Sequence, residues 1–520
     1  MYDIIIKNAK IIDGTGNPCY RSDVAIKDGK IARIGKGLEG AEQVIDATGL
    51  TLTPGFIDSH SHVDRHILTY PEQREKIEQG ITTSIAGQCG ESSAPISKLF
   101  TDTEATIGNY GRKIDIFKTP KSYFNTIKDI PQGANTALLI GNSALRGAVI
   151  GPDDRRATPE EMEQMKALLR EGLEAGALGV SFGLIYAPGC FADTEELTEL
   201  AKVVAEYNGV VAAHIRDEGF RLVRALEEFI SVIKASGARG VISHHKAGNK
   251  ENWGKITHTL QMVEDACAEG YEIYFDVYPY VASHTSMASS FIPKVYHTEG
   301  IAALCRKLDD PEVRAAIKEF QREIRGATED FSWVLPVKCP AYPEYEGKRL
   351  NEIAKIHGKD VLDTMMDMIR DGNGICNACY FTMCEEDVCR VMAHPRSMIG
   401  TDAAVRGDSD IYHPRLRGTF PRVLGRYVRE RGVTTLTKMI AKITSLPATV
   451  YGLQSKGLIK EGFDADICIF DAEKIIDRAD FTDCHARAEG LNYVLVGGEV
   501  VVENAVHNGK RNGKIILFDR

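Results

Sequence analysis

Two histidines stand one residue apart at the end of an apolar run, in the segment PGFIDSHSHVD at residues 54–64. Side chains at positions i and i+2 of a strand point to the same side, so His60 and His62 can face a common target. Imidazole is a frequent ligand of transition metals and a proton acceptor near neutral pH. The pair alone fits either a metal site or two structural histidines, so its meaning depends on what the rest of the chain places beside it.

Further metal-capable side chains follow other strand-like runs. Cys89 ends TTSIAGQC, His214 lies in VVAAHIR, His244 lies in GVISHHK, and Asp402 ends SMIGTD. A set of imidazole, thiolate and carboxylate groups is typical of zinc sites. Six such groups on five strand ends therefore favour a metal centre over unrelated structural residues. His245 should face the opposite side from His244, and we expect it to be structural or to support the site.

These residues belong to predicted strands that alternate with helical stretches such as PEEMEQMKALLREGLEAG. Strand–helix alternation on this scale predicts an α/β fold with a parallel sheet. Eight strands are expected, at residues 56–62, 82–89, 136–142, 178–183, 210–216, 240–246, 271–279 and 397–402. The simplest arrangement is a (β/α)8 TIM-like barrel, whose active site lies at the carboxyl ends of its strands.

The two ends of the chain have a different pattern. Residues 1–52 and 453–520 alternate apolar and polar side chains, with turns such as KDGK between the runs, and we expect them to pair in a small β-sandwich domain. The catalytic barrel is then predicted to span 53–452. Within it, residues 283–345 break the strand–helix rhythm. This excursion follows the seventh predicted strand and is either a lid over the active site or an insertion without motion.

Composition excludes several classes of partner. The net charge of −10 over 520 residues argues against nucleic acid or an anionic membrane as the main ligand. No apolar run is long enough to span a bilayer, and the segment MYDIIIKNAKIIDG lacks the features of a signal peptide. The twelve cysteines show no disulfide-like spacing, which favours a reducing cytoplasm with free or metal-bound thiols.

The order of the motifs carries a family resemblance. HSH after PGFID, then GQCG, AAHIRDEG, ISHHK, IGTDA and HPRLRGTFPRVLGRY resemble the amidohydrolase superfamily, and more narrowly the N-acyl-D-amino acid deacylases, or D-aminoacylases. The resemblance runs along nearly the whole chain, with GQCG in place of the usual GNCG. It implies zinc-dependent hydrolysis of the amide of an N-acyl-D-amino acid, giving a carboxylate and a free D-amino acid. The preference for the D form comes from the resemblance alone.

The resemblance also implies roles for the metal-capable residues. A tight zinc site would be held by three ligands, Cys89, His214 and His244. A second, weaker position would be formed or bordered by His60, His62 and Asp402. Asp402 would be the general base that takes a proton from water and then delivers it to the departing amine. A rival interpretation makes Cys89 a covalent nucleophile, but it leaves the HSH pair unexplained.

A small-molecule substrate with a free carboxylate calls for cations and hydroxyl groups in the site. The resemblance assigns this role to Lys246, Tyr278 and Arg415, which otherwise would form structural ion pairs or lie on the surface. His284 takes the place of a family serine, and could bind an anion or reshape the side-chain pocket. Arg406, in the loop after Asp402, is a weaker candidate and is expected to be an exposed loop residue.

Two other interpretations remain open, one a different enzyme and the other a protein without catalytic activity. A cyclic-amide hydrolase of the dihydroorotase or hydantoinase type usually has a carboxylated lysine at the end of the fourth strand, whereas this strand reads LGVSFGLIY. An inactive binding barrel would be expected to lose metal ligands, and this chain keeps them.

A cysteine-rich segment, CNACYFTMCEEDVC, offers a second possible site. Its four cysteines would either bind a structural metal or be buried with free thiols. They are Cys376, Cys379, Cys384 and Cys389. ACYFTM is expected to form a strand, and the acidic residues after Cys384 indicate the start of a helix.

Overall fold

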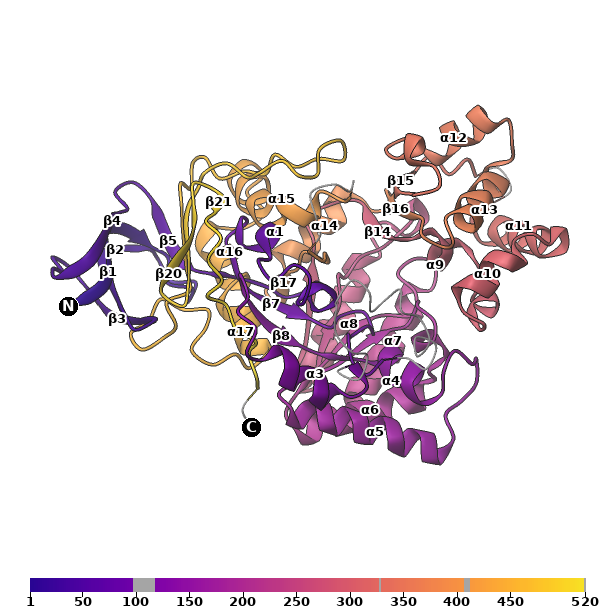
Figure 1. Cartoon of the computed structure of the whole chain (residues 1–520), viewed down its shortest axis with the longest axis horizontal. Helices are drawn as coiled ribbons and strands as arrows, with labels where there is room; N and C mark the ends of the chain where they lie inside the picture. Colours follow the sequence, from indigo (N-terminus) through magenta and orange to yellow (C-terminus); the bar gives the residue numbers. More distant parts are fainter. Residues whose placement is uncertain (97–116, 327–328, 406–411, 519–520) are drawn as a thin grey trace.

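The computed structural model describes residues 1–96, 117–326, 329–405 and 412–518. It has a mixed α/β fold, in which parallel strands and their helices lie between a terminal sheet and a group of inserted helices (Figure 1). The N-terminal strands β1–β4 lie at one end of the molecule, and the inserted helices α10–α13 lie at the other.

The central part of the chain forms parallel sheets. One has the order β6-β7-β8, and the other has the order β17-β13-β12-β11-β10-β9. The strand bounds are β6 Phe56–Asp58, β7 Ile81–Ala86, β8 Asn135–Leu138, β9 Ile140–Gly141, β10 Gly179–Gly183, β11 Val210–His214, β12 Arg239–Ile242, β13 Ile273–Val277 and β17 Ser397–Ile399. All eight predicted strands therefore overlap an observed strand, and the third is divided into β8 and β9.

The two parallel sheets are connected at both of their edges. A single residue, Leu139, separates β8 from β9. At the other edge, the segment after β6 bonds to the segment after β17, since Ser59 N donates to Ile399 O at 3.2 Å and Asp402 N donates to His60 O at 2.8 Å. These bonds bring the first and last strands of the parallel region side by side.

Amphipathic helices follow the strands and cover them. They are α1 Arg74–Ile77, α3 Pro120–Ile127, α4 Asn142–Val149, α5 Pro159–Glu174, α6 Thr194–Glu206, α7 Leu222–Ser236, α8 Ile256–Ala268 and α14 Glu385–Ala393. In α5, Thr158 and Glu161 form a reciprocal capping box and Pro159 occupies the first turn, which fixes where the helix begins. Its buried residues Met165, Leu169 and Leu173 recur every four positions, so one face packs into the central core.

Four helical elements follow the last parallel strand. They are α15 Arg415–Arg422, the π-helical segment η8 Val423–Glu430, α16 Leu436–Lys442 and α17 Ser445–Val450. Through Arg415, this region also contributes to the site described below.

Both chain ends contribute to one nine-stranded sheet of order β21-β20-β19-β18-β5-β1-β2-β3, with β4 beside β1. The bounds are β1 Tyr2–Ile11, β2 Tyr20–Lys27, β3 Lys30–Gly35, β4 Ala41–Asp46, β5 Thr51–Pro54, β18 Ile467–Phe470, β19 Leu491–Val496, β20 Glu499–Glu503 and β21 Val506–His507. β5 pairs antiparallel with β18, which joins the two ends. The KDGK turn connects β2 to β3, where Asp28 and Gly29 have positive φ angles of 48° and 74°, as tight hairpin turns require.

The excursion after β13 contains strands and helices of its own. Its strands are β14 Ser283–Ser286, β15 Val334–Lys338 and β16 Asn377–Tyr380. They form an antiparallel sheet of order β14-β16-β15, with β16 in the middle. Its helices are α9 Met287–Phe291, α10 Ile301–Lys307, α11 Pro311–Arg325, α12 Leu350–His357 and α13 Val361–Asp371. These elements from 283 to 380, called here the inserted layer, share their own apolar core.

The cysteine-rich segment does not form a four-thiol site. Cys376 forms a disulfide with Cys339, whereas Cys379, Cys384 and Cys389 are free. The expectation that all of these thiols are free was therefore wrong for Cys376, because its partner lies 37 residues earlier, outside the segment. The predicted strand and helix are present as β16 and α14.

None of the helices within the described ranges is long and apolar enough to cross a membrane.

Candidate active site and metal centre

Parallel strands deliver the metal-capable side chains to one end of the central sheets. His214 is the last residue of β11, and the others lie just beyond strand ends: His60 and His62 after β6, Cys89 after β7, His244 after β12 and Asp402 after β17. The carboxyl ends of parallel strands are where ligands bind in α/β folds. The predicted strands extend beyond the carboxyl ends of the observed strands, because the chain leaves the sheet at the residues that build the site.

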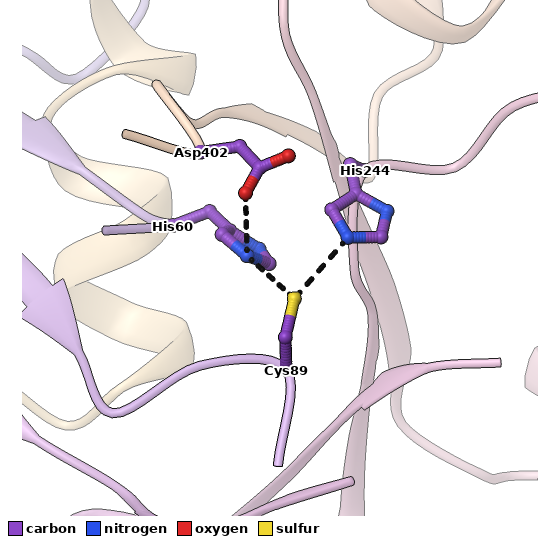
Figure 2. A group of neighbouring side chains, drawn as sticks. All are labelled: His60, Cys89, His244 and Asp402. Carbon is purple, nitrogen blue, oxygen red and sulfur yellow. Dashed lines mark hydrogen bonds and ion pairs between the residues drawn. The ribbon is translucent and has the colours of Figure 1, made fainter. Parts of the chain in front are cut away.

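The Cys89 thiol lies at the centre of the cluster (Figure 2). Its Sγ is 3.3 Å from His60 Nε2, 3.4 Å from His244 Nε2 and 3.7 Å from His214 Nδ1. Asp402 Oδ1 is 3.6 Å from His60 Nε2. The donor atoms of His60, Cys89, His244 and Asp402 all lie within 4.8 Å of one another, which is close enough for a shared cation.

The backbone is strained at three of these residues. Cys89, His244 and Asp402 have positive φ angles of 54°, 37° and 48°. Non-glycine residues in this region cost on the order of 1 kcal/mol or more, and such residues concentrate at functional sites. The three strands therefore end in conformations that surrounding contacts must stabilise.

A buried ion pair supplies part of that stabilisation. Lys76 Nζ lies 2.8 Å from Asp58 Oδ2, and both side chains are 0% exposed. The same ammonium donates to Thr401 Oγ1 at 2.6 Å and Ala403 O at 2.8 Å, while Asp58 accepts from Thr401 N at 2.8 Å. These bonds tie the end of β6, which leads to the HSH pair, to the segment that carries Asp402.

Two carboxylates that sequence analysis missed contact the histidines. Glu218 Oε2 lies 3.4 Å from His214 Nε2, and its Oε1 lies 2.9 Å from His244 Nδ1. Asp276 Oδ2 lies 3.4 Å from His60 Nδ1, and its Oδ1 accepts from His244 N at 2.8 Å. The only sequence signals were an acid four residues after His214 and a single acid inside the apolar strand β13.

Asp402 is held ionised by its neighbours. Burial alone would raise its pKa, but the charge of Arg415 and a hydrogen bond from His62 outweigh burial and hold the pKa of Asp402 well below its usual value. Arg415 Nη1 is 2.8 Å from Asp402 Oδ2, and His62 Nε2 is 3.1 Å from Asp402 Oδ1. Burial lowers the pKa of His62 to about 4, so this imidazole is neutral at neutral pH.

The environment of Cys89 does not suit a covalent nucleophile. Burial raises the pKa of its thiol, although the neighbouring His60 opposes this, whereas a nucleophilic cysteine needs a lowered pKa. Burial also holds the pKa values of His214 and His244 well below the ordinary value. The Cys89 thiol and the neutral imidazoles of His214 and His244 are suitable ligands for a cation that displaces the thiol proton.

The four candidate substrate-binding residues also lie around the cluster. Lys246 Nζ lies 2.5 Å from Glu218 Oε1, and Arg415 is paired with Asp402 as described above. The buried Tyr278 ring has Arg415 Cζ 4.9 Å and Lys246 Nζ 5.6 Å from its centroid, and its hydroxyl has no hydrogen-bond partner in the described ranges. His284 lies in β14, and its carbonyl accepts from Arg415 Nη2 at 3.3 Å.

Two cavities that share wall residues open at the cluster. One of about 220 Å³ is lined by His62, Cys89 and Arg415, and one of about 300 Å³ is lined by His214, His244 and Lys246. Both include Tyr186, His284 and Asp402 in their walls. The larger cavity is also walled by inserted-layer residues, namely Ser283, Ser289, Ser290, Lys294, Ile324, Arg325, Trp333 and Tyr380. The inserted layer therefore covers part of the site.

Two other candidates lie away from the cluster or outside the described structure. His245 Nε2 is 2.9 Å from Thr259 Oγ1 of α8, and its ring packs against Phe275, as expected for a structural residue. Arg406 lies outside the described residues.

The chain is similar over nearly its whole length to known hydrolases. A family model described as "Amidohydrolase family" matches residues 43–502. The chain is 33% identical to a D-aminoacylase and 34% identical to an N-acyl-D-glutamate deacylase, both from Alcaligenes xylosoxydans xylosoxydans, over 99% of this chain and 97% of each relative.

Solved structures of N-acyl-D-amino acid deacylases are also similar to this chain. An N-acyl-D-glutamate deacylase from Bordetella bronchiseptica, complexed with zinc and a phosphonate mimic of the tetrahedral intermediate, superposes with a TM-score of 0.84 at 32% identity, with 99% of each chain covered. A D-aminoacylase structure matches with a TM-score of 0.84 at 34% identity, over 100% of each chain. A hydantoinase from Arthrobacter aurescens, at 16% identity and a TM-score of 0.58 over 99% of this chain and 100% of its own, shares the fold alone.

Proposed function

The chain belongs to the amidohydrolase family, and we propose that it hydrolyses the amide bond of N-acyl-D-amino acids to a carboxylate and a free D-amino acid. The observation that carries this function is the Cys89-centred cluster with Asp402 at its edge, in a chain whose full-length relatives are D-amino acid deacylases. The family resemblance seen in the sequence is confirmed by the family match.

The donor set fits zinc. Two ligands at Zn–S and Zn–N distances of roughly 2.3 and 2.0 Å, at a tetrahedral angle, lie about 3.5 Å apart. The distances from Cys89 Sγ to His244 Nε2 and His214 Nδ1, 3.4 and 3.7 Å, match this spacing. They support the tight site that the family resemblance assigns to Cys89, His214 and His244, while His60 Nε2 lies at a similar distance of 3.3 Å from the same thiol. A second, weaker position would be bordered by His60, His62 and Asp402.

When bound, zinc supplies Lewis acidity to a water molecule and to the substrate carbonyl. Asp402 accepts the proton from water and passes it to the leaving amine. The neighbouring Arg415 and the neutral His62 keep its carboxylate oriented and ionised for the first of these steps. The backbone of Asp402 has a strained, positive φ angle. The hydrogen bonds from Lys76 to the adjacent residues Thr401 and Ala403 hold Asp402 at the cluster.

The α-carboxylate of the substrate binds to the cationic side of the cavities. Lys246 and Arg415 supply charge, and the unpartnered hydroxyl of the buried Tyr278 supplies a hydrogen bond. Arg415 has five N–H donors, so it can hold Asp402 and the substrate together. His284 borders both cavities, and we propose that it shapes the pocket for the substrate side chain.

The larger cavity favours an acidic substrate side chain. Arg325 Nε donates only to Gln321 Oε1, at 2.9 Å, and its guanidinium stacks 4.9 Å from the Trp333 ring centre. Lys294 bonds only to the carbonyls of Ile185 and Ser289. In the part of the chain that the structure describes, neither cation has a carboxylate partner. We infer that a second carboxylate on the substrate fills this role.

The architecture that supports the site is proposed to be a closed (β/α)8 barrel spanning 53–452, with a β-sandwich from 1–52 and 453–520. The backbone bonds that link the two parallel sheets at both edges support closure. The inserted layer is proposed to be a lid, because its side chains wall the larger cavity.

The test is a stereo-resolved assay of zinc-loaded protein on N-acetyl-D- and N-acetyl-L-amino acids with acidic, apolar and basic side chains, measuring released amine. We expect turnover of D substrates only, with N-acetyl-D-glutamate or N-acetyl-D-aspartate fastest. Turnover of cyclic amides alone would replace the proposal with a hydantoinase-type function. No turnover of any amide by zinc-loaded protein would favour an inactive binding barrel.

A further inference from the structure

Glu218 lies directly behind both imidazoles of the tight metal site. Its two carboxylate oxygens divide between them, Oε2 at 3.4 Å from His214 Nε2 and Oε1 at 2.9 Å from His244 Nδ1. The side chain is 19% exposed, so it is largely withdrawn from water. One carboxylate thus contacts two candidate ligands at once.

The opposite nitrogens of the same rings face the thiol. His214 Nδ1 and His244 Nε2 lie 3.7 and 3.4 Å from Cys89 Sγ. A metal beside Cys89 needs a lone pair on each of these nitrogens, so each ring must carry its hydrogen on the nitrogen that faces Glu218. Only an acceptor can stabilise that arrangement, and the carboxylate places one oxygen 2.9 Å from His244 Nδ1 and the other 3.4 Å from His214 Nε2, an atom without a hydrogen-bond partner within the described residues.

Lys246 opposes this arrangement at His244. Its Nζ lies 2.7 Å from His244 Nδ1, the same atom that faces Glu218 Oε1. An ammonium can only donate, so a Lys246 hydrogen bond to Nδ1 requires the His244 hydrogen to sit on Nε2, facing the thiol. In that form His244 cannot ligate a metal beside Cys89. Glu218 and Lys246 therefore favour opposite tautomers of one ring.

We propose that Glu218 is a positioning residue that sets the metal-binding tautomers of His214 and His244, and that metal binding releases Lys246 from His244. Once Nδ1 carries its hydrogen and donates to Glu218, the Lys246 ammonium keeps only its bond to Glu218. Its remaining hydrogens then face the larger cavity, where the substrate carboxylate would bind. This last step rests on the proposed function, whereas the effect on metal affinity does not.

The test is zinc affinity, measured by competition with a chromogenic chelator that reports free zinc. Glu218→Gln should weaken zinc binding about 10–100-fold, because an amide offers one acceptor and one donor and cannot accept from both rings. Lys246→Met should bind zinc at least as tightly as the unaltered protein, because the competing donor is gone. The matched control is Glu228→Gln, which removes a carboxylate that pairs with Arg216 at 2.8 Å on α7, away from the imidazoles.

Far-UV circular dichroism of the metal-free variants checks that each is folded, and the absorption spectrum of the Co²⁺-loaded protein reports ligand geometry. We expect an altered Co²⁺ spectrum for Glu218→Gln and an unchanged one for Glu228→Gln. A zinc affinity within threefold of the unaltered protein for Glu218→Gln would overturn the proposal. Weakening by Lys246→Met as large as that by Glu218→Gln would overturn the opposition between the two residues. Neither the zinc affinity nor the Co²⁺ spectrum requires a substrate. These measurements therefore test the role of Glu218 even if the protein does not hydrolyse N-acyl-D-amino acids.

Discussion

At the residue scale, the charges of the site are arranged around Asp402. Burial would make this group a neutral acid, but Arg415 at 2.8 Å and His62 at 3.1 Å outweigh burial and hold its pKa well below the ordinary value. The group is therefore an acceptor at neutral pH, which is the state that a general base requires. Two chain segments far apart in sequence, around His62 and Arg415, decide the protonation state of this one carboxylate.

Replacing the base tests that role. Asp402→Asn keeps the size and loses the proton acceptor, so kcat on the best N-acetyl-D-amino acid should fall about 10²–10⁴-fold. Zinc per protein, measured by atomic absorption, should stay at the level of the unaltered enzyme for the tight site, since Asp402 borders the weaker position. More than a tenth of the original kcat with zinc retained would contradict the assignment.

The unpaired cations of the larger cavity make a prediction about selectivity. Arg325→Met keeps an apolar side chain against Trp333 and removes the charge. We expect kcat/KM for N-acetyl-D-glutamate to fall at least tenfold while kcat/KM for N-acetyl-D-leucine changes less than threefold, because only the former offers a second carboxylate. The control is Arg322→Met, an exposed arginine on the same helix α11. Equal losses for both substrates would show that Arg325 supports the fold rather than selecting the side chain.

At the element scale, the ends of β6 and β17 are joined by buried polar groups rather than by a long ladder. β6 and β17 have three residues each, so short strands must be held in place by the contacts that follow them. Lys76 from α1 supplies three hydrogen bonds to this junction, to Asp58, Thr401 and Ala403. The short helix α1 thereby fixes the loop that carries Asp402.

Breaking one side of this junction should be costly. Lys76→Met leaves the Asp58 carboxylate buried and unpaired, and we expect a loss of about 3–5 kcal/mol of stability. Asp58→Asn combined with Lys76→Met should lose less than the sum of the two single variants, because no buried charge is left over. The measurement is the urea unfolding midpoint of metal-free protein. Strict additivity would argue against the ion pair as the element that joins the strands.

At the scale of the whole molecule, the inserted layer has its own apolar core and covers part of the candidate active site. It is tied internally by the Cys339–Cys376 disulfide, which links the loop after β15 to the start of β16. Closing a loop of 37 residues removes chain entropy from the unfolded state worth about 4 kcal/mol in the loop-closure model.

The disulfide can be tested by counting thiols. Unfolded protein alkylated without a reductant should incorporate ten alkyl groups, one for each free cysteine, and twelve after reduction, measured by intact mass. Peptide mapping should place the two protected positions at Cys339 and Cys376. Twelve alkylated cysteines without reductant would show that the inserted layer is held by apolar packing alone.

The sequence indicated the strands and the candidate ligands well because both leave local signals. Apolar runs such as VVAAHIR and GVISHHK each overlap an observed strand, and histidine, cysteine and aspartate are conspicuous where such runs end. The ends of the strands were misplaced because Cys89, His244 and Asp402 adopt left-handed backbone conformations that β propensity does not encode. Glu218 was missed because an acid in the loop after a strand looks like any solvated side chain.

By itself, the sequence determined the donor set, the strand–helix alternation and the family, since residue types and periodicities are properties of short segments. Only the tertiary structure decided which groups are partners. The pairing of Asp58 with Thr401 spans 343 residues, that of Arg417 with Glu78 spans 339, and Glu218 meets His244 across two strands. Such contacts depend on where the packed sheet brings strand ends together, and local sequence carries no measure of that distance.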